Sequence, residues 1–96
     1  MKQLTIEEIK EKAVPILKEA GISKSAIFGS YVRGDASQSS DIDFLVAFPE
    51  KATLLDFVRL QRTLEDNLQK RVDLVSYNAI SPLIKDSIFK NHYQLL

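Results

Sequence analysis

Apolar residues recur at the three- and four-residue spacing of an amphipathic helix in three parts of the chain. This spacing predicts helices over residues 5–20, 53–69 and 82–90. Each helix begins at a residue suited to cap a helix N-terminus, namely Thr5, Thr53 and Ser81. Glu8, three positions after the first of these, completes a capping box.

Shorter apolar runs between these helices predict strands over residues 25–28, 41–48 and 71–76, with a short last strand expected over 93–96. A single turn of helix is expected within residues 31–35, followed by a polar loop. The order αβ(α)βαβαβ predicts an α/β (α+β) two-layer sandwich with a small mixed sheet. A length of 96 residues predicts one domain spanning residues 1–96.

Composition excludes several classes of site. The chain has no cysteine, so a disulfide framework, a thiolate zinc site and a catalytic thiol are all impossible. The 13 basic and 13 acidic residues balance, which argues against non-specific attraction of nucleic acid. No apolar run approaches the roughly 20 residues of a membrane span, so a cytoplasmic location is predicted. No Walker motif and no Gly-x-Gly-x-x-Gly fingerprint is present.

Two aspartates, Asp41 and Asp43, stand two residues apart at the start of the strand predicted over 41–48. Alternate residues of a strand share a face, so both carboxylates are expected to project together. Their repulsion is relieved by a divalent cation such as Mg²⁺ or Mn²⁺, although an exposed acidic strand face is the plain alternative. Ser40, directly before the pair, either contributes to a nucleotide site or only caps the loop. The opposite face is expected to enter the core through Ile42, Phe44, Val46 and Phe48.

Gly29 and Ser30 follow the first predicted strand and form a turn suited to phosphate. Glycine allows close approach of the backbone, and serine adds an N–H and a hydroxyl donor. Arg33 adds a guanidinium for a phosphate oxygen, with a surface ion pair to Asp35 as the alternative. An ordinary turn remains the other interpretation of the Gly-Ser pair.

Asp73 is a third acidic candidate, on the strand predicted over 71–76. If this strand lies beside the strand carrying Asp41 and Asp43, all three carboxylates face the same side. Three convergent carboxylates complete a two-metal site, whereas an isolated aspartate on an edge strand is the alternative. Tyr31, beside the Gly-Ser turn, is expected to pack against the core or to stack on a base.

These features together resemble the nucleotidyltransferase superfamily built on the DNA polymerase β-type fold. The Gly-Ser-x-x-Arg-Gly turn, the Ser-Asp-Ile-Asp-Phe-Leu-Val strand and the Arg-Val-Asp-Leu-Val strand look like minimal nucleotidyltransferase (MNT) domains. The similarity runs from the first helix to about residue 90.

The resemblance implies transfer of a nucleoside monophosphate, AMP from ATP, to a hydroxyl, with two Mg²⁺ ions. It implies three catalytic and metal-binding residues, Asp41, Asp43 and Asp73, and four nucleotide-binding residues, Gly29, Ser30, Arg33 and Ser40. Asp73 would also help to deprotonate the acceptor hydroxyl.

Minimal nucleotidyltransferases resembling this chain are commonly the antitoxins of helical HEPN ribonuclease toxins, and several adenylylate a tyrosine of the toxin. The resemblance therefore implies a HEPN-type partner. Two alternatives stay open: an antitoxin that neutralises its partner by binding alone, and a small-molecule nucleotidyltransferase of the aminoglycoside type. A chain this short is expected to receive its acceptor from a partner protein or at a homo-oligomer interface, without direct contact to nucleic acid or membrane.

Overall fold

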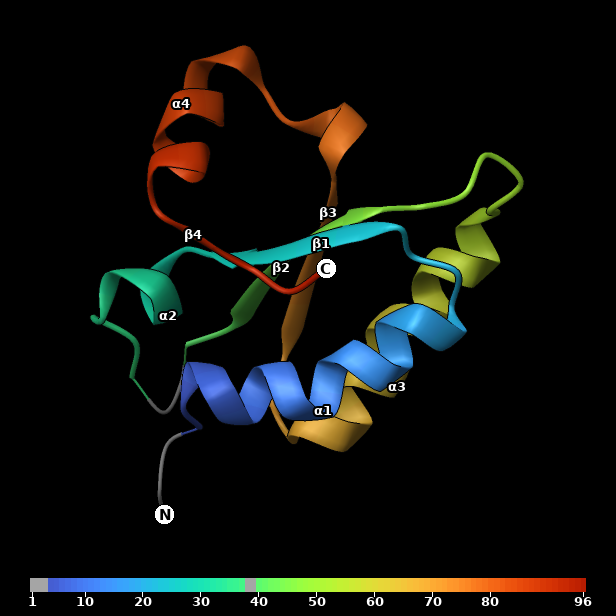
Figure 1. Ribbon diagram of the computed structural model, residues 1–96, viewed down its shortest axis with the longest axis horizontal. Helices are drawn as coiled ribbons and strands as arrows, with labels where there is room; N and C mark the ends of the chain where they lie inside the picture. The colour runs from blue at the N-terminus through green and yellow to red at the C-terminus, as the bar shows by residue number, and fades with distance from the viewer. Residues whose placement is uncertain (1–3, 38–39) are drawn as a thin grey trace.

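A computed structural model describes residues 4–37 and 40–96 (Figure 1). The elements in chain order are α1 (Ile6–Glu19), β1 (Lys24–Phe28), α2 (Ser30–Arg33), β2 (Ile42–Ala47), α3 (Leu54–Leu68), β3 (Val72–Ser76), the 3₁₀ helix η1 (Tyr77–Ala79), α4 (Pro82–Lys90) and β4 (His92–Gln94). All the predicted elements form, and only η1 was not expected. The last strand lies earlier than predicted, because the amides of Leu95 and Leu96 leave it to donate to the Ser25 carbonyl. None of the helices formed by the described residues has the length and apolar character needed to cross a membrane.

The four strands form one mixed sheet in the order β3-β2-β1-β4. β2 is parallel to β3, whereas β1 is antiparallel to both of its neighbours, β2 and β4. The start of β2, the start of β3 and the end of β1 therefore meet at the same edge of the sheet. The predicted fold class, an α/β fold with a small mixed sheet, is confirmed.

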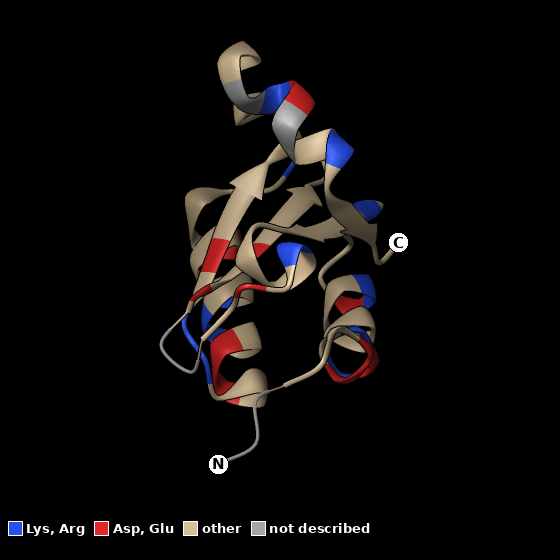
Figure 2. Cartoon of the chain, turned by 90° about the vertical axis from the view of Figure 1, so that its left-hand side faces the viewer, with Lys and Arg blue, Asp and Glu red and all other residues tan. Residues whose placement is uncertain are grey.

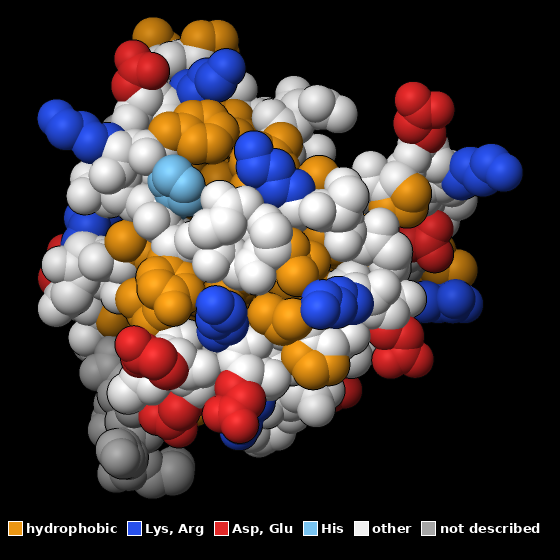
Figure 3. Space-filling model, in the orientation of Figure 1, with side chains coloured by type: hydrophobic (Ala, Val, Ile, Leu, Met, Phe, Trp, Pro, Cys, Tyr) orange, Lys and Arg blue, Asp and Glu red, His pale blue; other side chains and the backbone are white. Residues whose placement is uncertain are grey.

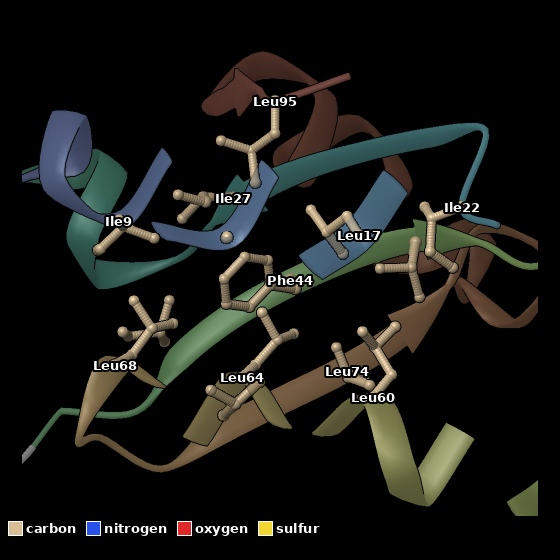
Figure 4. Close-up of a cluster of buried hydrophobic side chains, with 14 of the residues drawn as sticks. Ile9, Leu17, Ile22, Ile27, Phe44, Leu60, Leu64, Leu68, Leu74 and Leu95 are labelled. Atoms are coloured by element: carbon tan, nitrogen blue, oxygen red, sulfur yellow. The ribbon is translucent and has the colours of Figure 1, made fainter. Parts of the chain in front are cut away.

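Helices cover the two faces of this sheet unequally (Figure 1). α1 and α3 pack side by side on one face, and the main core lies beneath them (Figure 4). Phe44 of β2, Leu17 of α1 and Leu64 of α3 are all completely buried there. Each such side chain contributes about 1.5–3 kcal/mol relative to an exposed one. Ile42, Phe44 and Val46 all enter this core, as the alternation predicts.

The opposite face carries α4 and a much smaller cluster of buried residues, Ala26, Leu45 and Ile88. Leu45 belongs to β2, so this strand is buried on both faces. α4 thus adds a partial third layer to the two layers predicted. Asp43 lies on the same face as Leu45, because the two residues are two positions apart on one strand.

The first two long helices begin at the predicted caps. The Glu8 amide donates to Thr5 Oγ1 at 3.1 Å, and the Thr5 amide donates to Glu8 Oε1 at 3.2 Å. Thr53 and Asp56 form the same reciprocal pair at the start of α3, at 2.8 and 3.3 Å. Each box satisfies donors that a helix N-terminus leaves without partners inside the helix.

Two side chains of α3 contact the outer edge of β3. The Gln61 side-chain amide donates to the Val72 carbonyl at 2.8 Å, and the Val72 amide donates to Glu65 Oε2 at 3.0 Å. β3 is an edge strand of the sheet, so these bonds occupy backbone groups of Val72 that have no strand partner on that side.

Candidate active site

A cleft of about 300 Å³ opens where β1 ends and β2 begins. The sheet forms its floor, the start of α2 one wall and the end of α4 the other. Figure 2 looks onto this end of the sheet and shows acidic positions on adjoining strands close to the basic position of α2. The residues that line the cleft are Phe28, Gly29, Ser30, Arg33, Asp43, Ile88 and Asn91.

Gly29 links β1 to α2 and lies against Asp43. Its φ of 81° and ψ of −149° belong to a region that only glycine adopts readily. A Cβ atom at this position would overlap the Asp43 carboxylate and lie 3.2 Å from its Cγ atom. The Gly-Ser turn therefore brings backbone directly onto a carboxylate, and Ser30 begins α2 beside it.

Two of the three predicted acidic residues face each other across neighbouring strands. Asp43 of β2 and Asp73 of β3 are partners in the parallel register. The pKa of Asp43 is raised to about 6, mainly by burial and further by the charges of Asp73 and then Asp41, while Arg33 opposes the rise. The carboxylate of Asp43 thus lies in an excess of negative charge.

Asp41 lies just before β2, not within it, and has a different partner. Its Oδ1 atom is 3.3 Å from Nε of Arg71, which directly precedes β3. Over residues 4–37 and 40–96, no three His, Cys, Asp or Glu side chains are gathered closely enough to form a finished metal cluster. The sheet brings Asp43 and Asp73 together, whereas Asp41 forms an ion pair with Arg71.

The other candidates separate into cleft residues and residues with local roles. Arg33 lines the cleft and also pairs with Asp35, with Nε and Oδ2 3.3 Å apart. Ser40 is not among the described residues that line the cleft; its hydroxyl accepts a hydrogen bond from the Ser37 amide at 2.8 Å. Tyr31 is buried in the main core, so it packs there and does not stack on a base.

The family described as polymerase beta, nucleotidyltransferase, matches residues 11–96. The chain belongs to this family. A Methanocaldococcus jannaschii protein named as a candidate protein adenylyltransferase is 47% identical over 93 residues, covering 97% of this chain and 100% of that protein. The predicted class of enzyme, a nucleotidyltransferase, is confirmed.

Solved structures give the same result. A protein described as a minimal nucleotidyltransferase superposes with a TM-score of 0.81 at 34% identity, over 96% of this chain and 97% of that one. A chain from a crystal structure of a toxin-antitoxin with AMP-PNP superposes with a TM-score of 0.78 at 25% identity, over 91% of this chain and 72% of that one. The chain is therefore similar throughout its length to minimal nucleotidyltransferases.

Three residues that line the cleft were not predicted from the sequence: Phe28, Ile88 and Asn91. Phe28 pairs with Asp43 on one side and with His92 on the other, which brings the end of α4 to the cleft. No sequence motif marks Ile88 and Asn91, because their position depends on the pairing of β4 with β1.

The carboxylates fit a hard divalent cation by their chemistry. Asp43 and Asp73 offer oxygen ligands, which Mg²⁺ and Mn²⁺ prefer. The raised pKa of Asp43 means that its ionised form lacks compensating charge, and a cation between the two strands would supply it.

Proposed function

We propose that this chain is a Mg²⁺-dependent protein adenylyltransferase that moves AMP from ATP to a tyrosine hydroxyl of a HEPN-type toxin and thereby acts as its antitoxin. One observation carries the proposal. The half-buried Asp43 carboxylate, with its pKa raised to about 6, faces Asp73 and touches the Gly-Ser turn that begins at Gly29. This juxtaposition suits a metal held beside a triphosphate.

The reaction is an in-line displacement at the α-phosphorus of ATP. The acceptor oxygen forms a bond to this phosphorus, the bond from the phosphorus to the oxygen bridging to the β-phosphate breaks, and pyrophosphate leaves. The acceptor proton passes to a carboxylate of the site, for which the exposed Asp73 is the candidate, and then to solvent. Mg²⁺, when bound, neutralises developing charge and lowers the pKa of the acceptor hydroxyl.

Each residue of the site has a proposed role. Asp43, Asp73 and Asp41 would hold Mg²⁺, for which Asp41 would have to part from Arg71. The Gly-Ser turn accommodates the β- and γ-phosphates, because a side chain at residue 29 would fill the space beside Asp43. Arg33 offers a guanidinium to a phosphate oxygen from the wall of the cleft. The proposed nucleotide-binding role of Ser40 is indirect, because its hydroxyl bonds to the Ser37 amide.

A protein acceptor fits this chain better than a nucleic acid. The 13 basic residues are balanced by 13 acidic ones, and on the face in Figure 3 basic side chains are spread singly among acidic and apolar ones. Relatives named as protein adenylyltransferases and a neighbour from a toxin-antitoxin support a toxin as the acceptor, and AMP-PNP, an ATP analogue, supports ATP as the donor. The cytoplasmic location and a homo-oligomer stay predictions.

The test is the intact mass of a HEPN-type protein chosen as the partner of this chain. The two are co-expressed, with wild-type chain, with an Asp41→Asn/Asp43→Asn double variant and with Asp66→Asn. Asp66 is an exposed aspartate of α3 and serves as the matched control. We expect one or more added AMP groups with wild type and Asp66→Asn, and none with the double variant. Fragmentation of the modified protein identifies the acceptor residue.

The same experiment separates the two alternatives. An unmodified partner that is nevertheless bound and silenced by wild type and by the double variant would mean neutralisation by binding alone. Activity toward aminoglycosides with an unmodified partner would mean a small-molecule enzyme. Full modification by the double variant would overturn the assignment of the aspartates.

A further inference from the structure

Asn91 lies on the wall of the cleft. It caps the C-terminus of α4, and its backbone amide donates to the Ile88 carbonyl at 3.2 Å. Among the side chains that the structure describes, none forms a hydrogen bond with the side-chain amide of Asn91. The side chain is exposed and borders the same cleft as Gly29, Ser30 and Arg33.

Strand order places Asn91 at a defined end of the cleft. Asn91 directly precedes β4, whose His92 pairs with Phe28 at the end of β1. The order β3-β2-β1-β4 therefore arranges the site as Asp73, Asp43, the Gly-Ser turn and then Asn91. A nucleotide with its α-phosphate at the two carboxylates and its β-phosphate at the turn directs its terminal phosphate toward Asn91.

This end of the cleft needs hydrogen-bond donors. Among the lining residues that the structure describes, Arg33 is the one cation, and it is shared with Asp35. An asparagine amide provides two N–H donors without adding charge. The carbonyls at the end of α4 would disfavour an anion, because a helix C-terminus carries partial negative charge. Two of them already have partners: the Ile88 carbonyl accepts from the Asn91 amide, and the Phe89 carbonyl lies 2.8 Å from His92 Nδ1.

We propose that the Asn91 side-chain amide donates hydrogen bonds to the terminal phosphates of the nucleoside triphosphate, and so to the pyrophosphate that leaves. This inference rests on the proposed function, because it takes the α-phosphate to lie at Asp43 and Asp73. It gives α4 a part in binding the substrate, through the residue at its C-terminus.

The test compares ligands that contain or lack the terminal phosphates. Affinities for ATP, AMP and inorganic tripolyphosphate are measured calorimetrically in Mn²⁺ for wild type, Asn91→Ala and Asn91→Asp. The matched control is Asn78→Ala, an exposed asparagine of η1 outside the cleft. Thermal melting of each variant verifies that it is folded.

We expect Asn91→Ala to lower the affinity for ATP and for tripolyphosphate by about 5- to 20-fold, which corresponds to one or two lost hydrogen bonds. The affinity for AMP should stay within about twofold of the wild-type value. Asn91→Asp keeps the shape of the side chain but adds a negative charge. It should lower the affinity for ATP and tripolyphosphate further, because this charge repels their phosphates. Asn78→Ala should match wild type.

Two results would overturn the inference while the proposed function stands. In one, Asn91→Ala binds ATP and tripolyphosphate as wild type does. In the other, Asn91→Ala loses affinity for ATP and AMP to the same extent but keeps its affinity for tripolyphosphate, which would place Asn91 at the nucleoside. If wild type binds neither ATP nor tripolyphosphate in Mn²⁺, the proposed metal–phosphate site itself fails.

Discussion

The two faces of the sheet differ in how much they bury and in what they carry. Under α1 and α3, side chains such as Phe44 and Leu64 have no solvent exposure. Under α4 the described side chains include a smaller buried cluster of Ala26, Leu45 and Ile88, and Leu83 of α4 is 94% exposed. β2 serves both faces, with Phe44 in the main core and Asp43 in the cleft. Stability and chemistry are thus divided between opposite sides of one strand.

The largest expected effect concerns the face of the sheet that carries the cleft. Asp43→Asn should lower AMP transfer by about a thousandfold, the size seen when a key electrostatic group of a site is removed. The melting temperature should stay equal or rise, because a carboxylate with a raised pKa is unfavourable in the fold. Transfer is followed by mass spectrometry and melting by circular dichroism. A large loss of stability would show that Asp43 supports the fold as well.

The next effect is on the face with the main core. Leu64→Ala should lower the free energy of unfolding by about 2–5 kcal/mol, through lost burial and a cavity. Leu54→Ala on the same helix removes the same atoms from a side chain that is 80% exposed. It should change the free energy of unfolding by less than about 0.5 kcal/mol. Urea unfolding measures both. Transfer per folded molecule should be unchanged, and a selective loss in Leu64→Ala would mean that the faces are coupled.

Two glycines separate backbone strain from contact with the site. Gly29 and Gly34 have φ values of 81° and 84°, so alanine strains the backbone at both, by about 1–2 kcal/mol. Only at Gly29 does the added Cβ meet Asp43; at Gly34 it meets no atom within 4 Å. Gly29→Ala should therefore lower transfer by about 10- to 100-fold, whereas Gly34→Ala should lower stability alone. Equal transfer by the two variants would contradict the assigned contact.

The smallest effect is a pH dependence of stability without metal. Asp43 titrates near 3.8 when unfolded and about 6 when folded, so the folded state holds the extra proton between these values. Stability should therefore fall as pH rises from about 4 to 6, relative to Asp43→Asn, by about 1–2 kcal/mol after allowance for solvent screening. Urea unfolding in EDTA across this range measures the difference, and added Mg²⁺ should remove it. A flat difference would mean that the pKa of Asp43 is normal.

Much of the fold was predictable because its signals are local. Thr5 and Thr53 sit at the starts of α1 and α3, and a capping box needs only residues three positions apart. The alternation in β2 likewise sorted Phe44 from Asp43 without knowledge of any neighbouring strand. The strand order was not predictable from periodicity, because pairing between β1 and β4 joins residues far apart in the chain.

The site was predictable in its motif and not in its surroundings. Gly29 and Asp43 were identified together from the sequence, and they touch in the structure. The pairing of Asp41 with Arg71 depends on the parallel register of β2 and β3, which no local pattern reveals. The place of Asn91 depends on how α4 returns to the sheet, so the sequence held no signal for it.

The contacts of Gln61 and Glu65 with Val72 also bear on self-association. An uncovered edge strand offers a template on which strands of other molecules can add, and this is a common route to aggregation. At the start of β3, an incoming strand would first have to displace two side chains of the protein's own helix. The hydrogen bonds that hold α3 against the sheet therefore also hinder the addition of strands from other molecules to β3, the edge strand that carries Asp73.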